Sequence, residues 1–204
     1  MEADYQFLAA AEVDEVARKL LGMQLWVQSA EGVCAGIITE TEAYGGAEDR
    51  ASHAFGGKMT LRNAVMYQAA SAIYVYRCYG IHHLFNIVTG QEAEPAAVLI
   101  RALRPIAGLE LMQQRSNVVH PDLCCNGPGK LSRSMGISLE HNGSRLQQGK
   151  IWLQDSEIQV SDIVTGPRVG VGYAGSDALL PRRFYIRGEQ SVSRPLFQKY
   201  SLQN

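Results

Sequence analysis

Residues 73–88, IYVYRCYGIHHLFNIV, give a direct indication of the fold. They contain two runs of aromatic and β-branched residues on either side of Gly80. Runs of this composition favour strands, and a short break at a glycine is typical of a β-hairpin. The sequence therefore predicts a hairpin with Gly80 near its tip, in which Tyr74 and Tyr76 share one face because strand side chains alternate.

Strands and helices are predicted on both sides of this hairpin. Helical spacing is found at residues 11–22, which end in a glycine, and at 106–115, and a loop that opens a helix is expected at 125–137. The tail after Arg194 has no clear pattern. We expect a mixed α+β fold, with residues 1–204 forming a single domain. Further strands are predicted at residues 23–28, 34–44, 96–103, 151–154, 168–173 and 184–188.

Composition limits the class of protein. A chain of 204 residues with 46% hydrophobic and 19% charged residues is long enough for one ordinary core. The first residues are acidic where a secretory signal needs basic ones, and no apolar run approaches the roughly 18 residues of a membrane span. We therefore expect an intracellular protein, in the cytoplasm or nucleoid if bacterial and in the nucleus if eukaryotic. Four irregularly spaced cysteines without a CxxC pair favour reduced packing residues.

The charge of the chain gives no direct sign of nucleic-acid binding. A formal net charge of -1 lacks the basic excess that phosphate contacts usually require. Acidic residues gather in the first 50 positions, and basic residues punctuate the rest, which leaves a one-sided basic face open as a hypothesis. These basic residues are Arg101, Arg104, Lys130, Arg133, Arg145, Arg168, Arg182, Arg183 and Arg187.

A candidate site begins in the stretch ITETEAY. If it forms a strand, Glu40, Glu42 and Tyr44 point to one face, because successive side chains alternate. The following loop, residues 45–57, has glycines at both ends and brings His53 within reach of that face. A carboxylate, a tyrosine and a histidine are the ingredients of general-base chemistry. Taken alone, the pattern also fits two solvated acids and a histidine that caps a loop.

Two further segments have open interpretations. Tyr79, beside Gly80, is either a half-buried turn aromatic or a wedge that fills the gap left by a nucleotide extruded from DNA. The adjacent His82 and His83 face opposite ways on a strand, which disfavours a shared metal. Residues 126–130, NGPGK, lack the spacing of a P-loop, and they are either a turn before a helix or a phosphate contact at a helix N-terminus.

Five blocks, taken in order, decide between these alternatives. They are ETEAYGGAEDRASHAFGG (40–57), IYVYRCYGIHHLFNIV (73–88), VLIRALRPIAG (98–108), NGPGKL (126–131) and RVGVGYAG (168–175). Together they resemble the alkyladenine (3-methyladenine) DNA glycosylase family, of the human alkylpurine-glycosylase type, over about residues 6–190. The resemblance implies one α+β domain with a curved antiparallel sheet, surrounding helices and a protruding β-hairpin, related to the C-terminal domain of formyltransferases.

The resemblance also implies catalytic and intercalating residues. Glu42 is expected to activate a water molecule, with Arg101 and the backbone carbonyl of Val169 as the other ligands of that water. Tyr79 is expected to intercalate into DNA, with Ile81 beside it where the human-type pattern has methionine. A carboxylate at this position can stabilise a sugar with oxocarbenium character and take a proton from the incoming water.

The same resemblance implies a binding slot for the flipped base. Tyr44 and His53 are expected on one side of the base and Tyr76 on the other, and Asn86 is expected to clash with the 2-amino group of normal guanine. Aromatic walls attract cationic alkylpurines and also stack neutral lesions. The implied substrates are 3-methyladenine, 7-methylguanine, hypoxanthine and ethenoadenine.

The implied function is that of a monofunctional DNA glycosylase in base excision repair. It would flip alkylated or deaminated purines out of double-stranded DNA and hydrolyse the N-glycosidic bond, leaving an abasic site. No cofactor and no metal are expected, and the enzyme is expected to act as a monomer. Leu61 stands where the human-type pattern has proline, which leaves the substrate range open. Two alternatives are a binding module without catalysis and a metal-dependent hydrolase that uses Glu42 and His53.

Overall fold

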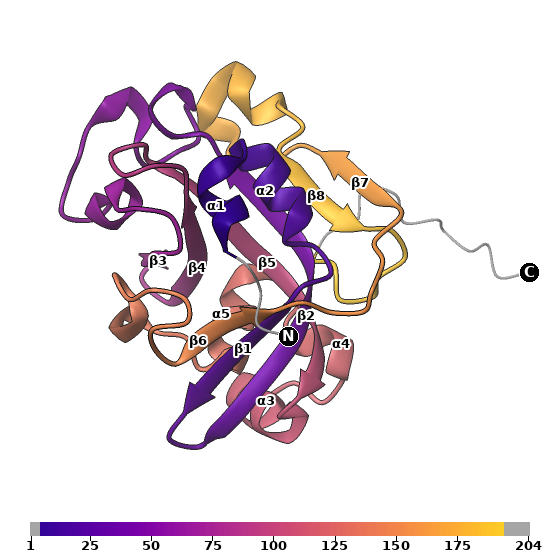
Figure 1. Ribbon diagram of the computed structural model, residues 1–204. Coiled ribbons are helices and arrows are strands. Elements are labelled where there is room, and N and C mark those ends of the chain that lie inside the picture. The colour runs from indigo at the N-terminus through magenta and orange to yellow at the C-terminus, as the bar shows by residue number, and fades with distance from the viewer. Residues whose placement is uncertain (1–4, 194–204) are drawn as a thin grey trace, which may run out of the picture.

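The computed structural model describes residues 5–193, and its centre is one antiparallel sheet (Figure 1). The strand order is β3-β4-β5-β2-β1-β6, while β8 pairs with β2 and β7 pairs with β8. Every one of these pairs is antiparallel. The strands are β1 Gln24–Ser29, β2 Gly32–Tyr44, β3 Ile73–Cys78, β4 His82–Thr89, β5 Ala96–Ala107, β6 Ile151–Gln154, β7 Ile163–Gly166 and β8 Arg183–Ile186.

Short helices surround the sheet. The α-helices are α1 Gln6–Ala10, α2 Val13–Lys19, α3 Leu109–Ser116, α4 Pro121–Cys124 and α5 Pro128–Met135. The 3₁₀ helices are η1 Gly46–Glu48, η2 Phe55–Gly57, η3 Ala64–Tyr67, η4 Leu139–His141 and η5 Gly172–Leu179. Within residues 5–193, no helix has the length and apolar character that crossing a membrane requires.

The two longest strands give the sheet its curvature. β2 pairs with β1 through its first half, and its Glu40–Glu42 segment pairs with β8 instead. The β2–β5 register shifts around Gly36 and on both sides of Glu40, and irregularities of this kind bend a strand and increase its twist. Gly36 is needed at its position, because a Cβ there would lie 2.9 Å from the Leu103 Cβ. The bent β2 therefore connects both halves of a curved sheet.

Alternation along β2 and β5 divides the sheet into two faces. Thr41 points toward α2, where its hydroxyl donates to the Ala17 carbonyl at 2.8 Å. Ala43, Val98 and Ile100 belong to the main hydrophobic core, together with Val16 and Leu20 from the α2 segment. The opposite face presents Glu42, Tyr44 and Arg101 to a cavity. Burial of the first face thus orients the second face toward the site.

The predicted α+β fold with a curved antiparallel sheet is confirmed, although several details differ from the prediction. Residues 168–173 were expected to form a strand, which is wrong: they form a loop that leads into η5. Polar contacts of that loop with β2 take the place of strand pairing. The short edge strand β7 was not predicted. The patternless tail after Arg194 lies outside the described residues.

Candidate active site

A cavity of about 800 Å³ lies against the face of the sheet that carries Glu42 of β2, Tyr74 of β3, Asn86 of β4 and Arg101 of β5. Loops 45–57 and 168–175 also border it, and they are joined by a hydrogen bond from the Tyr173 hydroxyl to the Ala51 carbonyl at 3.1 Å. Eight of the nine predicted site residues line this cavity: Glu42, Tyr44, His53, Tyr76, Tyr79, Asn86, Arg101 and Val169. The ninth, Ile81, is exposed beside the hairpin tip.

Strand register brings the centre of the site together. Tyr74 of β3 is paired with Asn86 of β4, Asn86 with Leu99 of β5, and Leu99 with Glu42 of β2. These four residues form one row across four strands and all line the cavity. Residues that are 12 to 57 positions apart in sequence are brought into one row because directly paired strand residues lie about 5 Å apart. The strand register therefore aligns an amide and a phenol in one row with the Glu42 carboxylate.

Glu42 is fully buried, accepts two hydrogen bonds and forms one ion pair. Its Oε1 accepts from the backbone N–H of Val169 at 2.7 Å, and its Oε2 accepts from the Tyr44 hydroxyl at 2.9 Å. Arg101 Nη1 lies 3.2 Å from the same Oε2. In the structure Val169 contacts Glu42 through its backbone amide. The role that the resemblance implies, binding of the water molecule, belongs to its backbone carbonyl. Three donors fix the carboxylate in the floor of the cavity.

A second acid, Glu40, lies behind this centre and is also fully buried. Its Oε1 accepts from Arg101 Nε at 2.8 Å and from Arg183 Nε at 2.7 Å. Burial alone would raise the pKa of Glu40, but the two guanidinium groups outweigh it and hold the pKa below its ordinary value. Burial would lower the pKa of Arg101, and the carboxylates of Glu42 and Glu40 raise it instead. Arg101 is therefore a permanent cation shared by two acids.

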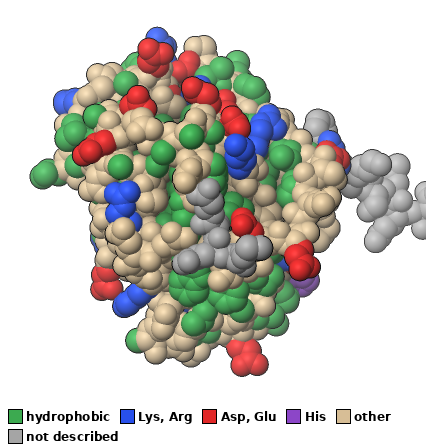
Figure 2. All heavy atoms as spheres, in the orientation of Figure 1, with side chains coloured by type: hydrophobic (Ala, Val, Ile, Leu, Met, Phe, Trp, Pro, Cys, Tyr) green, Lys and Arg blue, Asp and Glu red, His purple; other side chains and the backbone are tan. Residues whose placement is uncertain are grey.

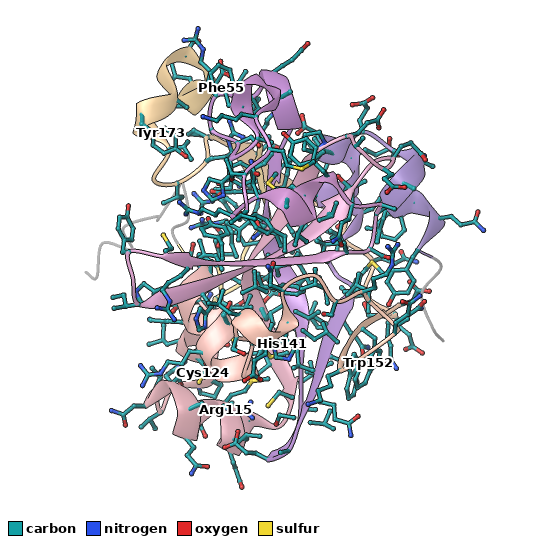
Figure 3. The ribbon with its side chains drawn as sticks, turned by 90° about the vertical axis from the view of Figure 1, so that its left-hand side faces the viewer. Phe55, Arg115, Cys124, His141, Trp152 and Tyr173 are labelled. Carbon is teal, nitrogen blue, oxygen red and sulfur yellow. The ribbon has the colours of Figure 1, made fainter. Side chains whose placement is uncertain are left out.

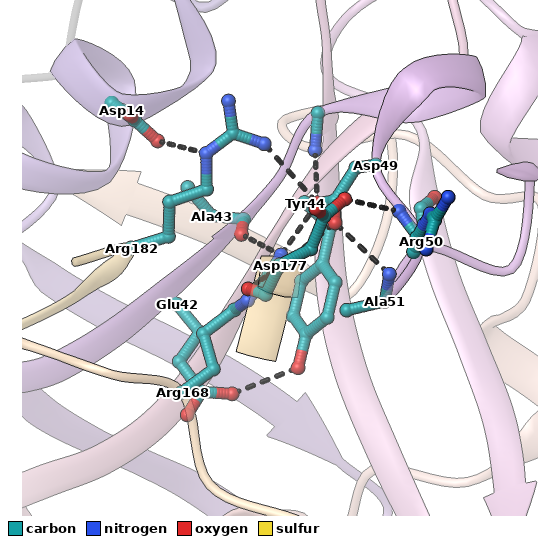
Figure 4. Close-up of polar contacts among 12 residues, drawn as sticks. Asp14, Glu42, Ala43, Tyr44, Asp49, Arg50, Ala51, Arg168, Asp177 and Arg182 are labelled. Atoms are coloured by element: carbon teal, nitrogen blue, oxygen red, sulfur yellow. Dashed lines mark hydrogen bonds and ion pairs between the residues drawn. The ribbon is translucent and has the colours of Figure 1, made fainter. Parts of the chain in front are cut away.

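A buried ion pair anchors the loop that supplies the Val169 amide (Figure 4). Arg168 donates from Nη2 to Asp49 Oδ1 at 2.8 Å, and its Nη1 also binds the Ala43 carbonyl of β2 at 2.9 Å. Its guanidinium carbon lies 4.9 Å from the centroid of the Tyr44 ring. Burial would raise the pKa of Asp49, but hydrogen bonds from Arg168 and from backbone amides lower it. The pair thus fixes both the loop and the ring next to Glu42.

Aromatic rings form one wall of the cavity. Tyr74 and Tyr76 are stacked with centroids 5.4 Å apart, and His53 meets Tyr76 edge to face at 4.5 Å. The Nδ1 atom of His53 lies 2.8 Å from the Tyr74 hydroxyl. A flat base between two rings needs a separation of about 7 Å, twice the contact distance. The gap between His53 and Tyr76 must therefore widen before a base can stack there.

The hairpin tip projects two apolar side chains. Tyr79 and Ile81 are 88% and 76% exposed. Tyr79 and Gly80 have φ angles of 50° and 72°, the left-handed pair that tight hairpin turns favour. The predicted hairpin, with Gly80 at its tip, is therefore confirmed. Its Tyr79 lines the edge of the cavity while remaining almost fully exposed.

The basic residues that the sequence singled out do not form one free face. Arg101, Arg168 and Arg183 are buried, and each contacts an acid inside the protein. Arg104 and Arg187 pair with Glu189 and Asp162 at the surface. Figure 2 shows blue and red side chains interspersed on the face in view. Burial of these three guanidinium groups beside carboxylates takes them out of any basic face, and a one-sided basic face made by the other six residues stays a prediction.

Cys34, Cys124 and Cys125 do not line the cavity, whereas Cys78, His53 and His82 do. All four cysteines are free, and Cys34, Cys124 and Cys125 are buried. Figure 3 shows Cys124 and Arg115 toward one end of the molecule, and Tyr173, which lines the cavity, at the other. In the described part of the chain, no group of three or more His, Cys, Asp or Glu side chains could hold a metal ion.

Comparison with known proteins places this chain in a family. The family model described as methylpurine-DNA glycosylase (MPG) matches residues 6–190. The chain belongs to the methylpurine-DNA glycosylase family. Membership confirms the predicted family and enzyme class, a DNA glycosylase, over the range of residues that the sequence blocks indicated. The assignment to the human type within the family stays a prediction.

Bacterial relatives of the family cover most of the chain. A protein named "Putative 3-methyladenine DNA glycosylase" from Chlamydia pneumoniae is 43% identical over 188 residues, which are 91% of this chain and 95% of that protein. One of the same name from Bacillus licheniformis is 41% identical over 88% of this chain and 91% of its own length. Another from Rhodopseudomonas palustris is 42% identical over 91% and 88%.

Sequence reasoning missed several residues that shape this glycosylase site. Asp49 and Ser193 received no role, and Arg168 was named only for a basic face, although all three make buried or partly buried polar contacts around Glu42 and Glu40. Glu40 was placed on the same face as Glu42, which the structure confirms. The signal for Glu40 was strand alternation. Asp49 and Arg168 are 119 positions apart, so no local pattern marks them as partners.

Proposed function

We propose that this protein is a monofunctional DNA glycosylase in which Glu42 activates water to hydrolyse the N-glycosidic bond of damaged purines. The observation that supports this most directly is a fully buried carboxylate, held by three donors, in the floor of a cavity with an aromatic wall. Cleavage develops positive charge on the sugar, and a fixed carboxylate stabilises that charge without reorganising. The same carboxylate takes a proton from the attacking water.

The donors around Glu42 have different roles in the proposed mechanism. Arg101, Tyr44 and the Val169 amide hold both carboxylate oxygens in place, and Oε1, which accepts from the Val169 amide, retains a further acceptor site for a water proton. In this proposal Arg101 and the carbonyl of Val169 help to orient that water. Hydrolysis releases the free base and leaves an intact strand with an abasic site. A lyase step would need an amine nucleophile, which the proposed mechanism does not use.

The proposed substrate range rests on the wall of the cavity. Tyr44 and His53 would stack on one side of the flipped base and Tyr76 on the other, once the gap beside His53 opens. Burial and the nearby charge of Arg62 lower the pKa of His53 to about 4, so His53 is neutral at physiological pH. A neutral imidazole does not repel cationic 3-methyladenine or 7-methylguanine, and it stacks on neutral hypoxanthine or ethenoadenine.

Asn86 is proposed to reject normal guanine. It is buried, and its Nδ2 donates to the Tyr74 and Leu84 carbonyls at 3.0 and 3.3 Å. A side chain held by two backbone carbonyls cannot rotate away from an incoming 2-amino group without losing both bonds. The partner in this proposal is double-stranded DNA with a damaged purine, bound by a monomeric, single-domain intracellular enzyme. Kinship of the fold with the C-terminal domain of formyltransferases is part of the same proposal.

The test is single-turnover excision on duplexes that contain hypoxanthine, ethenoadenine or 3-methyladenine, with the wild type and Glu42→Gln. Glutamine keeps the shape of the side chain but cannot take the proton, so we expect excision to fall at least about 100-fold. Lesion binding should change by less than about threefold, because no contact with the base is removed. Chelator should leave the wild-type rate unchanged.

Three results would count against this assignment. Equal excision by Glu42→Gln would remove Glu42 from the role of base. Tight lesion binding without base release by either protein would indicate a binding module instead. Loss of activity on adding a chelator, restored by zinc, would indicate a metal-dependent hydrolase.

A further inference from the structure

Ser193 lies at the point where Glu40 and Arg101 meet. Its backbone N–H donates to Glu40 Oε2 at 2.8 Å, and its hydroxyl donates to Glu40 Oε1 at 3.0 Å. The same hydroxyl oxygen accepts from Arg101 Nη2 at 3.1 Å. Ser193 also lines the cavity, three residues beyond the end of the segment matched by the family model. A residue outside the matched segment therefore contacts the catalytic machinery.

Each of the three guanidinium nitrogens of Arg101 contacts a different residue. Nε binds Glu40 at 2.8 Å, Nη2 binds the Ser193 hydroxyl at 3.1 Å, and Nη1 lies 3.2 Å from Glu42 Oε2. A guanidinium group is planar and rigid, so fixing two of its nitrogens also fixes the third. Glu42 is held by Arg101, and Arg101 in turn is held by Glu40 and Ser193.

We propose that Glu40 and Ser193 are positioning residues that hold Arg101 in the orientation required by Glu42. This inference rests on the proposed function, because Glu42 is the base only in that proposal. The side chain of a free arginine loses rotamer entropy when it is ordered. We call the contacts of Arg101 with Glu40 and Ser193 the clamp. These contacts offset the entropy cost on folding, before the substrate binds. Loss of the clamp should therefore slow the chemical step and leave the affinity for the lesion nearly unchanged.

A matched pair of serines makes the proposal testable. Ser191, two residues earlier, is fully buried and shares a hydrogen bond of 2.9 Å with Thr39, without contacting Arg101. Ser193→Ala removes the hydroxyl that links Arg101 to Glu40, whereas Ser191→Ala removes a hydroxyl of the same kind outside the clamp. Ser193→Thr restores the hydroxyl. The measurements are the single-turnover excision rate at saturating enzyme and the Kd for a lesion duplex.

We expect Ser193→Ala to lower the saturated rate about tenfold, the effect of losing one hydrogen bond to a charged group. The Kd should stay within about twofold of the wild-type value, since Arg101 is held in the floor and not in the binding wall. Ser193→Thr should recover most of the rate, and Ser191→Ala should match the wild type. Glu40→Gln should cost more, about 100-fold, because both arginines lose their shared charge partner.

The outcomes separate the clamp from the function itself. Wild-type rates for Ser193→Ala, in an enzyme that excises lesions, overturn the clamp and leave the proposed function intact. Equal losses in Ser193→Ala and Ser191→Ala also overturn it, because they indicate general loosening of the fold. Absence of base release by the wild type overturns the proposed function and the clamp together. If Glu40→Gln does not fold, the serine variants still decide the question.

Discussion

Asp49 and Arg168 form an ion pair that is sealed from solvent, with both side chains 0% exposed. Asp162 and Arg187 form a pair of the same chemistry at the surface, with exposures of 58% and 56%. We expect Asp49→Asn to lower the free energy of unfolding by about 3 kcal/mol, because it leaves a buried cation without its charge partner. Asp162→Asn should cost less than about 1 kcal/mol. Urea denaturation of both variants checks this, and equal costs would contradict it.

Titration of His53 makes the stability of the protein depend on pH between about 4 and 6.5. Its pKa is lowered from 6.5 to about 4 by burial and by Arg62, so the unfolded chain binds this proton more readily than the folded one. Stability should therefore fall as pH drops from 6.5 toward 4, since unfolding takes up a proton. Allowing for partial exposure, the loss between pH 7 and pH 5 should be about 1 to 2 kcal/mol.

The matched variant for this prediction is His53→Gln. It keeps a polar side chain beside Tyr74 but does not titrate in this range, so its unfolding free energy should depend less on pH between 7 and 5. The measurement is the urea midpoint at each pH for both proteins. Curves that run parallel for the wild type and His53→Gln would show that other groups cause the pH dependence.

At the residue level, the sequence predicts what depends on local spacing. Alternation predicts Glu40, Glu42 and Tyr44 on one face. In the structure Glu40 and Glu42 both contact Arg101, and the Tyr44 hydroxyl donates to Glu42. Ser193 is 153 positions from Glu40, and no periodicity relates two residues so far apart. Contacts of this kind follow from the completed fold, which explains why the clamp was not predicted.

The β3–β4 hairpin is an element whose tip has no packing role within residues 5–193, because Tyr79 and Ile81 are exposed. If the tip intercalates, Tyr79→Asn should weaken binding to a lesion duplex about tenfold, since stacking of a base on an aromatic ring is worth about 1 to 3 kcal/mol. Asparagine tolerates the left-handed backbone at this position, so the turn should persist.

An exposed residue away from the cavity provides the control for Tyr79→Asn. Val119 is 87% exposed and does not line the cavity. Val119→Ser should therefore leave lesion binding unchanged, and fluorescence anisotropy with a labelled duplex measures both variants. Unchanged affinity in Tyr79→Asn would exclude the wedge, and equal weakening in the two variants would indicate a non-specific loss of exposed apolar surface.

At the level of elements, strands with strong periodicity or aromatic content were predicted well. The hairpin, β2 and β5 all follow from their sequence patterns. Residues 168–173 contain valines at alternating positions, which predicted a strand, but their polar contacts are with β2 through Arg168 and the Val169 amide. Tertiary contacts decided the conformation there, and propensity alone could not show them.

The fold divides the 19 basic residues of the whole molecule into buried cations and exposed ones. Buried arginines shape the site and are unavailable to phosphates. Arg62 and Lys130 line the cavity as exposed cations; Lys130 Nζ donates to Asn126 Oδ1, a neutral acceptor, at 2.8 Å. Sequence charge alone could not separate these two groups, because burial depends on the fold.

The division between buried arginines and exposed cations predicts that DNA affinity depends only weakly on salt concentration. Each phosphate neutralised contributes a slope of about 0.9 in a plot of log Kd against log salt, so a few contacts should give a slope of about 2 to 4. Arg62→Ala and Lys130→Ala should each lower the slope by about 1, while Arg187→Ala, whose guanidinium pairs with Asp162 outside the cavity, should leave it unchanged. Titrations at several salt concentrations measure the slope for each variant. A wild-type slope near that of ten contacts, or an equal effect of all three variants, would mean that DNA binds across a wider surface than the rim of this cavity.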